Sequence, residues 1–169
     1  MSFGIYLDRQ VTHGPAEADR DAVRAALSRW GWAGSPGGPY QIGTEDGITV
    51  ELYSRGLDGD HPFVGGSLEV RGVSTDLCRL VLDLARAGPF TVSHDGDPGA
   101  VILVTEDQRA ELPDDLAAHP QLMVCPTAEA LEAAIVGGFE AWLAYRDRVC
   151  GRSPGALDAE PGAAPDPAM

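Results

Sequence analysis

The order in which strand-like and helical patterns follow one another restricts the fold of this chain more than any other feature. Short runs with alternating or continuous apolar residues cover 3–7, 48–53, 64–70, 90–92, 100–104 and 121–125. Helical periodicity covers 17–30, 75–87, a short stretch after Thr105, and 127–148. This order predicts an α+β fold, a mixed β-sheet with helices packed on it. The first six elements have the ferredoxin-like βαββαβ order, and a βαβα extension follows.

The segments also indicate how neighbouring strands pair and where helices begin. A turn-rich connection between the second and third strand-like runs predicts an antiparallel pair. The crossover between the last two runs predicts parallel strands. Ser74 and Thr127 are placed to cap the helices that follow them. The last helix has the most regular apolar stripe, with members spaced alternately by four and three residues: Leu131, Ile135, Gly138, Trp142, Tyr145 and Val149.

Composition divides the chain into one folded part and a tail. Residues 1–149 are long enough for a single α+β globular domain with one core. Residues 150–169 are rich in proline, alanine, glycine and acids, and Leu157 is their one large aliphatic residue, so we expect a disordered tail. Residues 1–8 lack the basic and apolar regions of a signal peptide. The expected location is therefore the cytoplasm.

The charge of the chain restricts its partners. There are 26 acidic residues against 12 basic ones, all of them arginine, which gives a formal net charge of −14. Nucleic acids and anionic membranes attract basic surfaces, so neither is an expected partner. A basic protein, in contrast, would be drawn in by this field. The alternative is that the charge only keeps the protein soluble.

One acidic segment, residues 106–115, is the densest part of this charge. Its five acids are offset by Arg109 alone, and they form a candidate docking surface for a basic protein: Glu106, Asp107, Glu111, Asp114 and Asp115. A solvated surface is the alternative. Trp32, close to Tyr40, is a further candidate for partner contact because aromatic residues concentrate interface energy. It could equally close the edge of the core.

Two turns contain residue types that bind metal ions. The candidate ligands are Asp58, Asp60 and His61 in the first turn, and His94, Asp95 and Asp97 in the second. Asp-Gly pairs are also ordinary turn residues, because aspartate bonds its own backbone and glycine accepts a positive φ. The chain has no recognised metal, nucleophile or dinucleotide motif, and it has no lysine for lysine-dependent catalysis. No cofactor and no catalytic residue are therefore predicted.

Together these features favour a small, acidic, non-catalytic bacterial protein that binds a basic partner protein. A bacterial immunity protein or antitoxin-like inhibitor has this general character. The alternative is an enzyme or a small-ligand or metal-binding protein with a polar site in the 58–61 and 94–97 turns. Either a monomer or a homodimer is compatible with the sequence, the second through the apolar stripe of the last helix.

Overall fold

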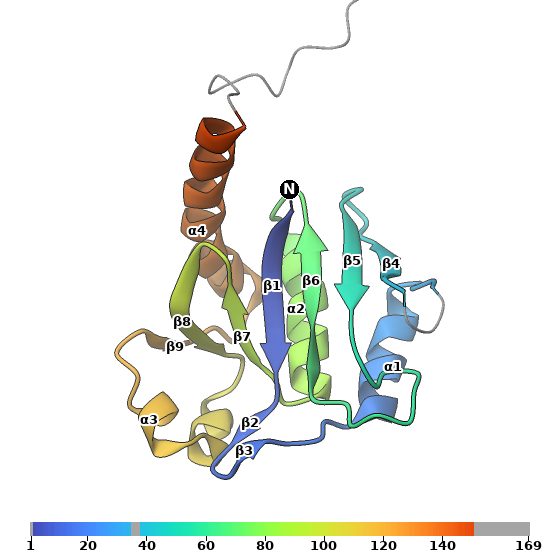
Figure 1. The fold of residues 1–169 in the computed structure, drawn as a ribbon, viewed down its shortest axis with the longest axis vertical. Helices are drawn as coiled ribbons and strands as arrows, with labels where there is room; N and C mark the ends of the chain where they lie inside the picture. The colour runs from blue at the N-terminus through green and yellow to red at the C-terminus, as the bar shows by residue number, and fades with distance from the viewer. Residues whose placement is uncertain (1, 35–37, 151–169) are drawn as a thin grey trace, which may run out of the picture.

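The computed structural model describes residues 2–34 and 38–150, and they form an α+β protein with a mixed seven-stranded sheet (Figure 1). The predicted tail at 150–169 lies outside the described residues, apart from Cys150. The strands are β1 Phe3–Asp8, β2 Gln10–Val11, β3 Gly14–Pro15, β4 Tyr40–Gly43, β5 Thr49–Tyr53, β6 Gly65–Val70, β7 Thr91–His94, β8 Asp97–Leu103 and β9 Leu122–Val124. The helices are α1 Arg20–Arg29, α2 Thr75–Ala87, the 3-10 helix η1 Glu106–Glu111, α3 Asp114–Ala117 and α4 Ala128–Val149.

The first strand lies in the middle of the sheet. The strand order is β4-β5-β6-β1-β7-β8-β9, and β2 and β3 form a separate small hairpin. Ile5 of β1 pairs with Leu68 on one side and with His94 on the other, both antiparallel. The predicted antiparallel pairing of β5 with β6 is confirmed, and so is the parallel pairing of β8 with β9.

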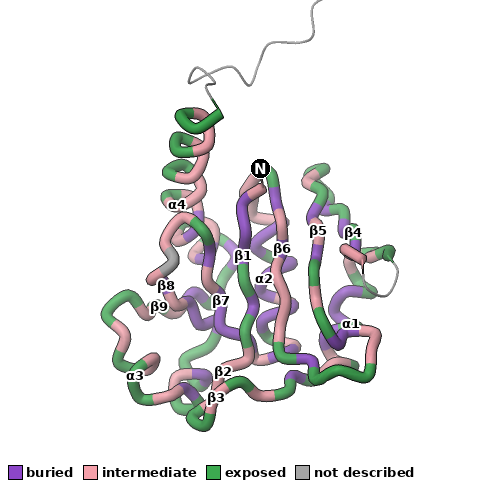
Figure 2. Tube along the Cα trace, viewed as in Figure 1, coloured by how far each residue is buried: buried purple, intermediate pink, exposed green. Residues whose placement is uncertain are grey.

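All three long helices lie on one face of the sheet. In Figure 1, α1, α2 and α4 lie behind the strands, with α2 between the other two. The alternating residues of each strand point towards them, and α2 contributes Leu77, Leu80, Val81 and Leu84 to the core. Figure 2 shows this buried layer running along α2 and the central strands. None of the helices in residues 2–34 and 38–150 covers the opposite face of the sheet.

The long helices begin at capping side chains. Ser74 Oγ accepts a hydrogen bond from the Leu77 amide at 3.1 Å, and Thr127 Oγ1 accepts one from the Ala130 amide at 3.2 Å, which confirms both predicted caps. Asp19 caps α1, so this helix begins at Arg20 and not at residue 17. A free backbone amide in the first turn of a helix needs such an acceptor.

Three parts of the chain differ from the sequence prediction. The short helix expected after Thr105, with its end before Pro113 or near Ala118, is the 3-10 helix η1 and ends at Glu111; α3 is a separate single turn, because Pro113 lacks an amide hydrogen and disfavours helix before it. Residues 97–99, predicted as part of a turn, belong to β8. Strand β4 and the β2–β3 hairpin were not predicted, since each offers few alternating apolar positions.

Candidate binding surface

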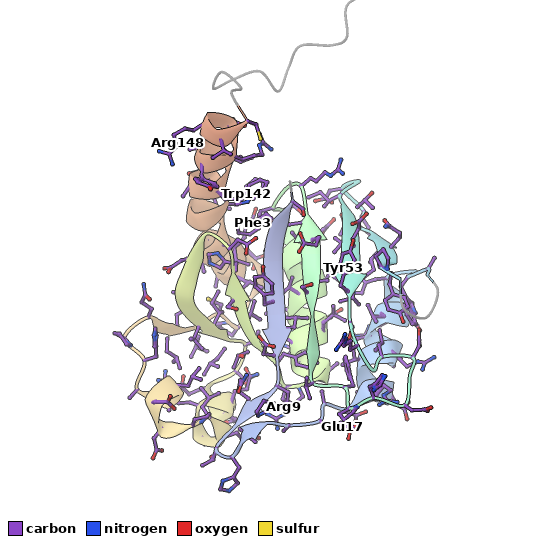
Figure 3. All side chains as sticks on the ribbon, in the orientation of Figure 1. Phe3, Arg9, Glu17, Tyr53, Trp142 and Arg148 are labelled. Carbon is purple, nitrogen blue, oxygen red and sulfur yellow. The ribbon has the colours of Figure 1, made fainter. Side chains whose placement is uncertain are left out.

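The face of the sheet opposite the helices is open and carries two rows of polar side chains across the strands. The alternation that sends Ile5 and Leu68 into the core sends their neighbours outwards. One row, which we call the hydroxyl row, contains Tyr53, Ser67, Tyr6 and Ser93 in direct register. The other, which we call the carboxylate row, contains Glu51 opposite Glu69, and then Asp95 next to Gly4. Tyr53 is labelled on this face in Figure 3.

Each exposed tyrosine of the hydroxyl row donates a hydrogen bond to a residue of the carboxylate row. The Tyr6 hydroxyl lies 2.7 Å from Asp95 Oδ1, and the Tyr53 hydroxyl lies 3.0 Å from Glu51 Oε2. The bond to Asp95, with a contribution from burial, raises the pKa of Tyr6 to about 12. The bond to Glu51 raises the pKa of Tyr53. Both phenols therefore remain neutral hydrogen-bonded groups near pH 7, with ring faces that a partner can contact.

The carboxylate row is held in place by donors from the fold. Asp95 Oδ2 accepts a hydrogen bond from the Gly4 amide at 2.7 Å. Glu51 Oε1 accepts one from Gln41 Nε2 at 3.1 Å, and the bonds from Gln41 and Tyr53 lower the pKa of Glu51. Glu51 and Glu69 stand directly opposite one another on neighbouring strands, where like charges repel, and Arg71, which lines the same hollow, offsets part of this repulsion at Glu51. A cation placed between them would relieve that repulsion.

Two hollows flank the rows. The first encloses about 650 Å³ and is lined by residues that include Ser2, Thr49, Glu51, Glu69 and Arg71. The second encloses about 510 Å³, and Tyr6, Asp8, Tyr53, Arg55 and Ser67 are among its lining residues. The open face thus combines aromatic rings, fixed carboxylates and concave surface, and these are features of a site that contacts a partner.

The acidic segment, residues 106–115, lies near the β9 edge of the sheet, where η1 and α3 connect β8 with β9. All five of its acids are exposed. Glu106 pairs with Arg109 at 2.7 Å, and Glu111 pairs with Arg9 at 2.6 Å. The other three acids make no ion pair within the described ranges 2–34 and 38–150: Asp107, Asp114 and Asp115.

Trp32 lies at the opposite edge of the sheet, beside β4. Its ring packs against Tyr40, with the ring centroids 4.9 Å apart, and it contacts the edge of the core. The Tyr40 hydroxyl donates to Asp58, which also pairs with Arg24 at 3.1 Å. Trp32 is therefore not brought together with the acidic segment. It closes the core edge and remains partly exposed beside a hollow of about 450 Å³.

The two turns of the metal hypothesis lie at opposite ends of the sheet. The 58–61 turn precedes Gly65, which pairs with Asp8 at one end of β1, whereas Asp95 bonds Gly4 at the other end. Arg20 fixes the first turn to α1 through the carbonyls of Gly59 and His61. The fold therefore does not unite the six candidates, and within the described part of the chain no group of three His, Cys, Asp or Glu side chains is arranged to hold a metal ion.

Within the second turn the three candidate ligands have separate surroundings. His94 is only 2% exposed, and its Nδ1 is buried without a hydrogen-bond partner among the described residues. Burial lowers the pKa of His94. Asp97 Oδ1 accepts a bond from the Gly99 amide at 3.2 Å, which is ordinary turn chemistry. Asp95 turns to the open face, where it belongs to the carboxylate row.

No known protein family, no curated protein and no solved structure matches this chain. In the ranges 2–34 and 38–150, no helix has both the length and the apolar character that a membrane span requires.

Sequence reasoning missed the two rows, although a signal for them was present. The alternation in 3–7, 48–53 and 64–70 separates the outward side chains, such as Tyr6 and Glu51, from the core residues. What the sequence does not supply is the strand order that aligns them across the sheet.

Proposed function

We propose that this protein is a non-catalytic binding protein, of the immunity or inhibitor type, that engages a basic partner protein through the open face of its sheet. The observation that carries the proposal is the pairing of the two exposed tyrosines with fixed carboxylates, Tyr6 with Asp95 and Tyr53 with Glu51. Tyrosine is enriched at protein interfaces because it combines a large ring with a polar hydroxyl. Here both hydroxyls are already oriented before a partner arrives.

The charge of the face favours a cationic partner. The opposed pair of Glu51 and Glu69 gains from a guanidinium or an ammonium placed near it. Aromatic rings on an open sheet can also stack on nucleic-acid bases, but the surrounding carboxylates would repel the phosphates. The net charge of −14 adds a long-range attraction for a basic protein.

The raised pKa values of the tyrosines also support binding over catalysis. A general acid or base works best when its pKa lies near the working pH. The pKa of Tyr6 is about 12, because Asp95 stabilises the protonated phenol. This tyrosine keeps its proton in the hydrogen bond to Asp95 and is not suited to exchanging a proton during turnover.

We assign a secondary role to the acidic segment. Glu106 and Glu111 are already engaged by Arg109 and Arg9, so they have less to offer a partner. Asp107, Asp114 and Asp115 would instead attract a basic protein from a distance, which increases the association rate more than the lifetime of the complex. Trp32, at the other edge, is proposed as a peripheral contact.

The strand arrangement supports a proposal about the fold as well. We propose that residues 1–149 form one domain and that β1, α1, β5, β6, α2 and β7 are a ferredoxin-like unit. The spatial order β5-β6-β1-β7, with antiparallel neighbours throughout, agrees with it. On this proposal β4 extends one edge, and β8 with β9 extends the other.

The partner can be sought with three matched charge reversals. Immobilised wild-type protein is used to capture basic proteins from an extract of the source cells, and each captured protein is then purified and its binding kinetics are measured. Glu69→Arg changes the open face, Asp114→Arg changes the acidic segment, and Glu17→Arg changes an exposed acid beside α1. All three alter the net charge equally, so a difference between them reports position.

The expected result is a basic partner whose dissociation constant rises at least about tenfold with Glu69→Arg, which corresponds to about 1.4 kcal/mol. Asp114→Arg should mainly slow association, and Glu17→Arg should change little. Wild-type protein that retains no basic partner would contradict the proposed function. A partner that binds the Glu69→Arg and Glu17→Arg variants equally well would exclude the open face as its site.

A further inference from the structure

Helix α4 projects beyond the rest of the fold. It has 22 residues, and a helix of this length extends about 33 Å. Its buried residues, Ala128, Leu131 and Ile135, all lie before the Gly137-Gly138 pair. Beyond these glycines the helix rises past the β7–β8 turn and the start of β1 (Figure 1). Within the part of the chain that the structure describes, its last turns therefore have no core of their own to pack against.

The apolar stripe of α4 nevertheless continues along this projecting part. Trp142 still packs on Phe3, with the ring centroids 5.8 Å apart, and both are labelled in Figure 3. Further along the same stripe, Tyr145 is 51% exposed and Val149 is 56% exposed. They are the two most exposed large apolar side chains of the described residues. A short helical segment is only marginally stable in water without tertiary packing, so an apolar stripe here favours a covering partner.

The charge of the projecting part differs from that of the whole chain. Between residues 139 and 149, Glu140 and Asp147 are balanced by Arg146 and Arg148, which gives a net charge of zero against −14 for the chain. Arg146 lies over the Trp142 ring at 5.3 Å, and Arg148 lies over the Tyr145 ring at 5.7 Å, so both cations border the stripe. Two copies of this acidic protein would repel one another over most of their surfaces, but not here.

We propose that a second copy of this chain covers the stripe, through an antiparallel pair of α4 helices related by a two-fold axis near Tyr145. In such a pair each contact occurs twice, and Trp142 of one copy lies opposite the partner's Val149. The two Tyr145 rings then meet at the axis. This proposal does not rest on the proposed function, because its apolar contacts lie on α4 and not on the open face of the sheet.

Charge complementarity supports the antiparallel arrangement over a parallel one. The β7–β8 turn carries Asp95 and Asp97, and its Gly96 packs so closely on Gly138 that a Cβ there would lie 2.2 Å from the Gly138 backbone. This acidic turn therefore lies beside the middle of α4. An antiparallel pair carries Arg148 of one copy towards the acidic turn of the other. A parallel pair would place the arginine-bearing ends of both helices together.

Sedimentation velocity of the full chain tests the proposal directly. The wild-type protein should form a species of about twice the 17.8 kDa chain mass, in a concentration-dependent equilibrium. Tyr145→Glu and Val149→Glu change exposed residues, so the fold should remain intact while the dimer dissociation constant rises at least about tenfold. Tyr53→Glu, which changes a tyrosine that is 43% exposed on the open face, is the matched control and should leave dimerisation unchanged.

A charge exchange distinguishes this interface from other modes of self-association. Arg148→Glu and Asp97→Arg should each weaken the dimer, and the double variant should restore most of the lost affinity. A chain that stays monomeric at every concentration overturns the proposal. So does a dimer that is unaffected by Tyr145→Glu or is weakened equally by Tyr53→Glu. A double variant that associates no better than the single variants overturns the antiparallel arrangement.

Discussion

Two successive glycines in α4 have different surroundings, and they allow a matched test of how this helix docks on the sheet. A Cβ added at Gly137 would meet no atom within 4 Å. A Cβ added at Gly138 would lie 2.5 Å from His94 Cε1, 2.9 Å from His94 Nδ1 and 3.1 Å from Gly96 Cα. Because His94 is buried and Gly96 contributes backbone, neither neighbour can move aside easily.

The expected magnitudes follow from two opposing effects. Replacing a glycine by alanine inside a helix stabilises it by about 0.8–1 kcal/mol, because alanine loses less backbone entropy. Gly137→Ala should therefore increase the free energy of unfolding by about that amount. Gly138→Ala gains the same contribution but overpacks a tight contact, which costs about 1–3 kcal/mol. The two variants should thus differ by about 1–3 kcal/mol, with Gly138→Ala the less stable.

Urea denaturation followed by circular dichroism would measure both free energies in the same buffer. Thermal unfolding offers an independent reading, since about 1 kcal/mol corresponds to roughly 2–4 °C for a chain of this size. The pair is its own control, because the propensity gain is common to both variants. Equal stabilities for Gly137→Ala and Gly138→Ala would refute the close contact between α4 and the β7–β8 turn.

Three further outcomes are expected. Burial lowers the pKa of His94 below its ordinary 6.5, so the neutral folded form is fully favoured above pH 6.5, and the free energy of unfolding decreases below it, where the unfolded chain takes up a proton more readily than the folded protein. The free energies of unfolding of wild type and His94→Leu should therefore depend differently on pH below 6.5. The same pH dependence in both proteins would contradict this expectation. Cys150 is exposed, whereas Cys78 and Cys125 are buried, and burial raises the pKa of Cys78 to about 12. One thiol should therefore react with a disulfide reagent in the folded protein, and all three should react after unfolding. Prompt reaction of a second thiol in the folded protein would argue against this packing. Ser74→Ala removes the acceptor for the Leu77 amide and should lower the free energy of unfolding by about 1 kcal/mol, while Ser74→Asp should retain most of it.

Patterns that depend on neighbouring residues could be predicted from the sequence. The stripe of α4 and the caps at Ser74 and Thr127 are local features, and the structure confirms them. The class of fold also follows, because alternation and helical periodicity determine the type of each element. The short helix expected after Thr105 is present as η1, but its 3-10 geometry and the separate turn of α3 after Pro113 were not predicted.

Arrangements that depend on strand direction could not be predicted in the same way. The 58–61 turn lies in the connection after β5, and the 94–97 turn follows the paired part of β7. With β6 and β1 between them and all neighbours antiparallel, β5 and β7 run in opposite directions. Their carboxyl ends therefore lie at opposite ends of the sheet, and two turns with similar residues are separated. The two rows of the open face arise from the same arrangement, which no single segment encodes.

The central position of β1 has a consequence for how the chain folds. Ile5 pairs with Leu68 and His94, so β1 leaves the ribosome before either of its neighbours, β6 and β7, has been synthesised. Pairings between residues this distant in sequence close large loops and make folding slow. Until then the apolar side of β1, with Phe3, Ile5 and Leu7, has no sheet to join. The nascent chain thus presents an unpaired apolar strand until β6 and β7 have followed it, and unpaired apolar strands of this kind favour aggregation.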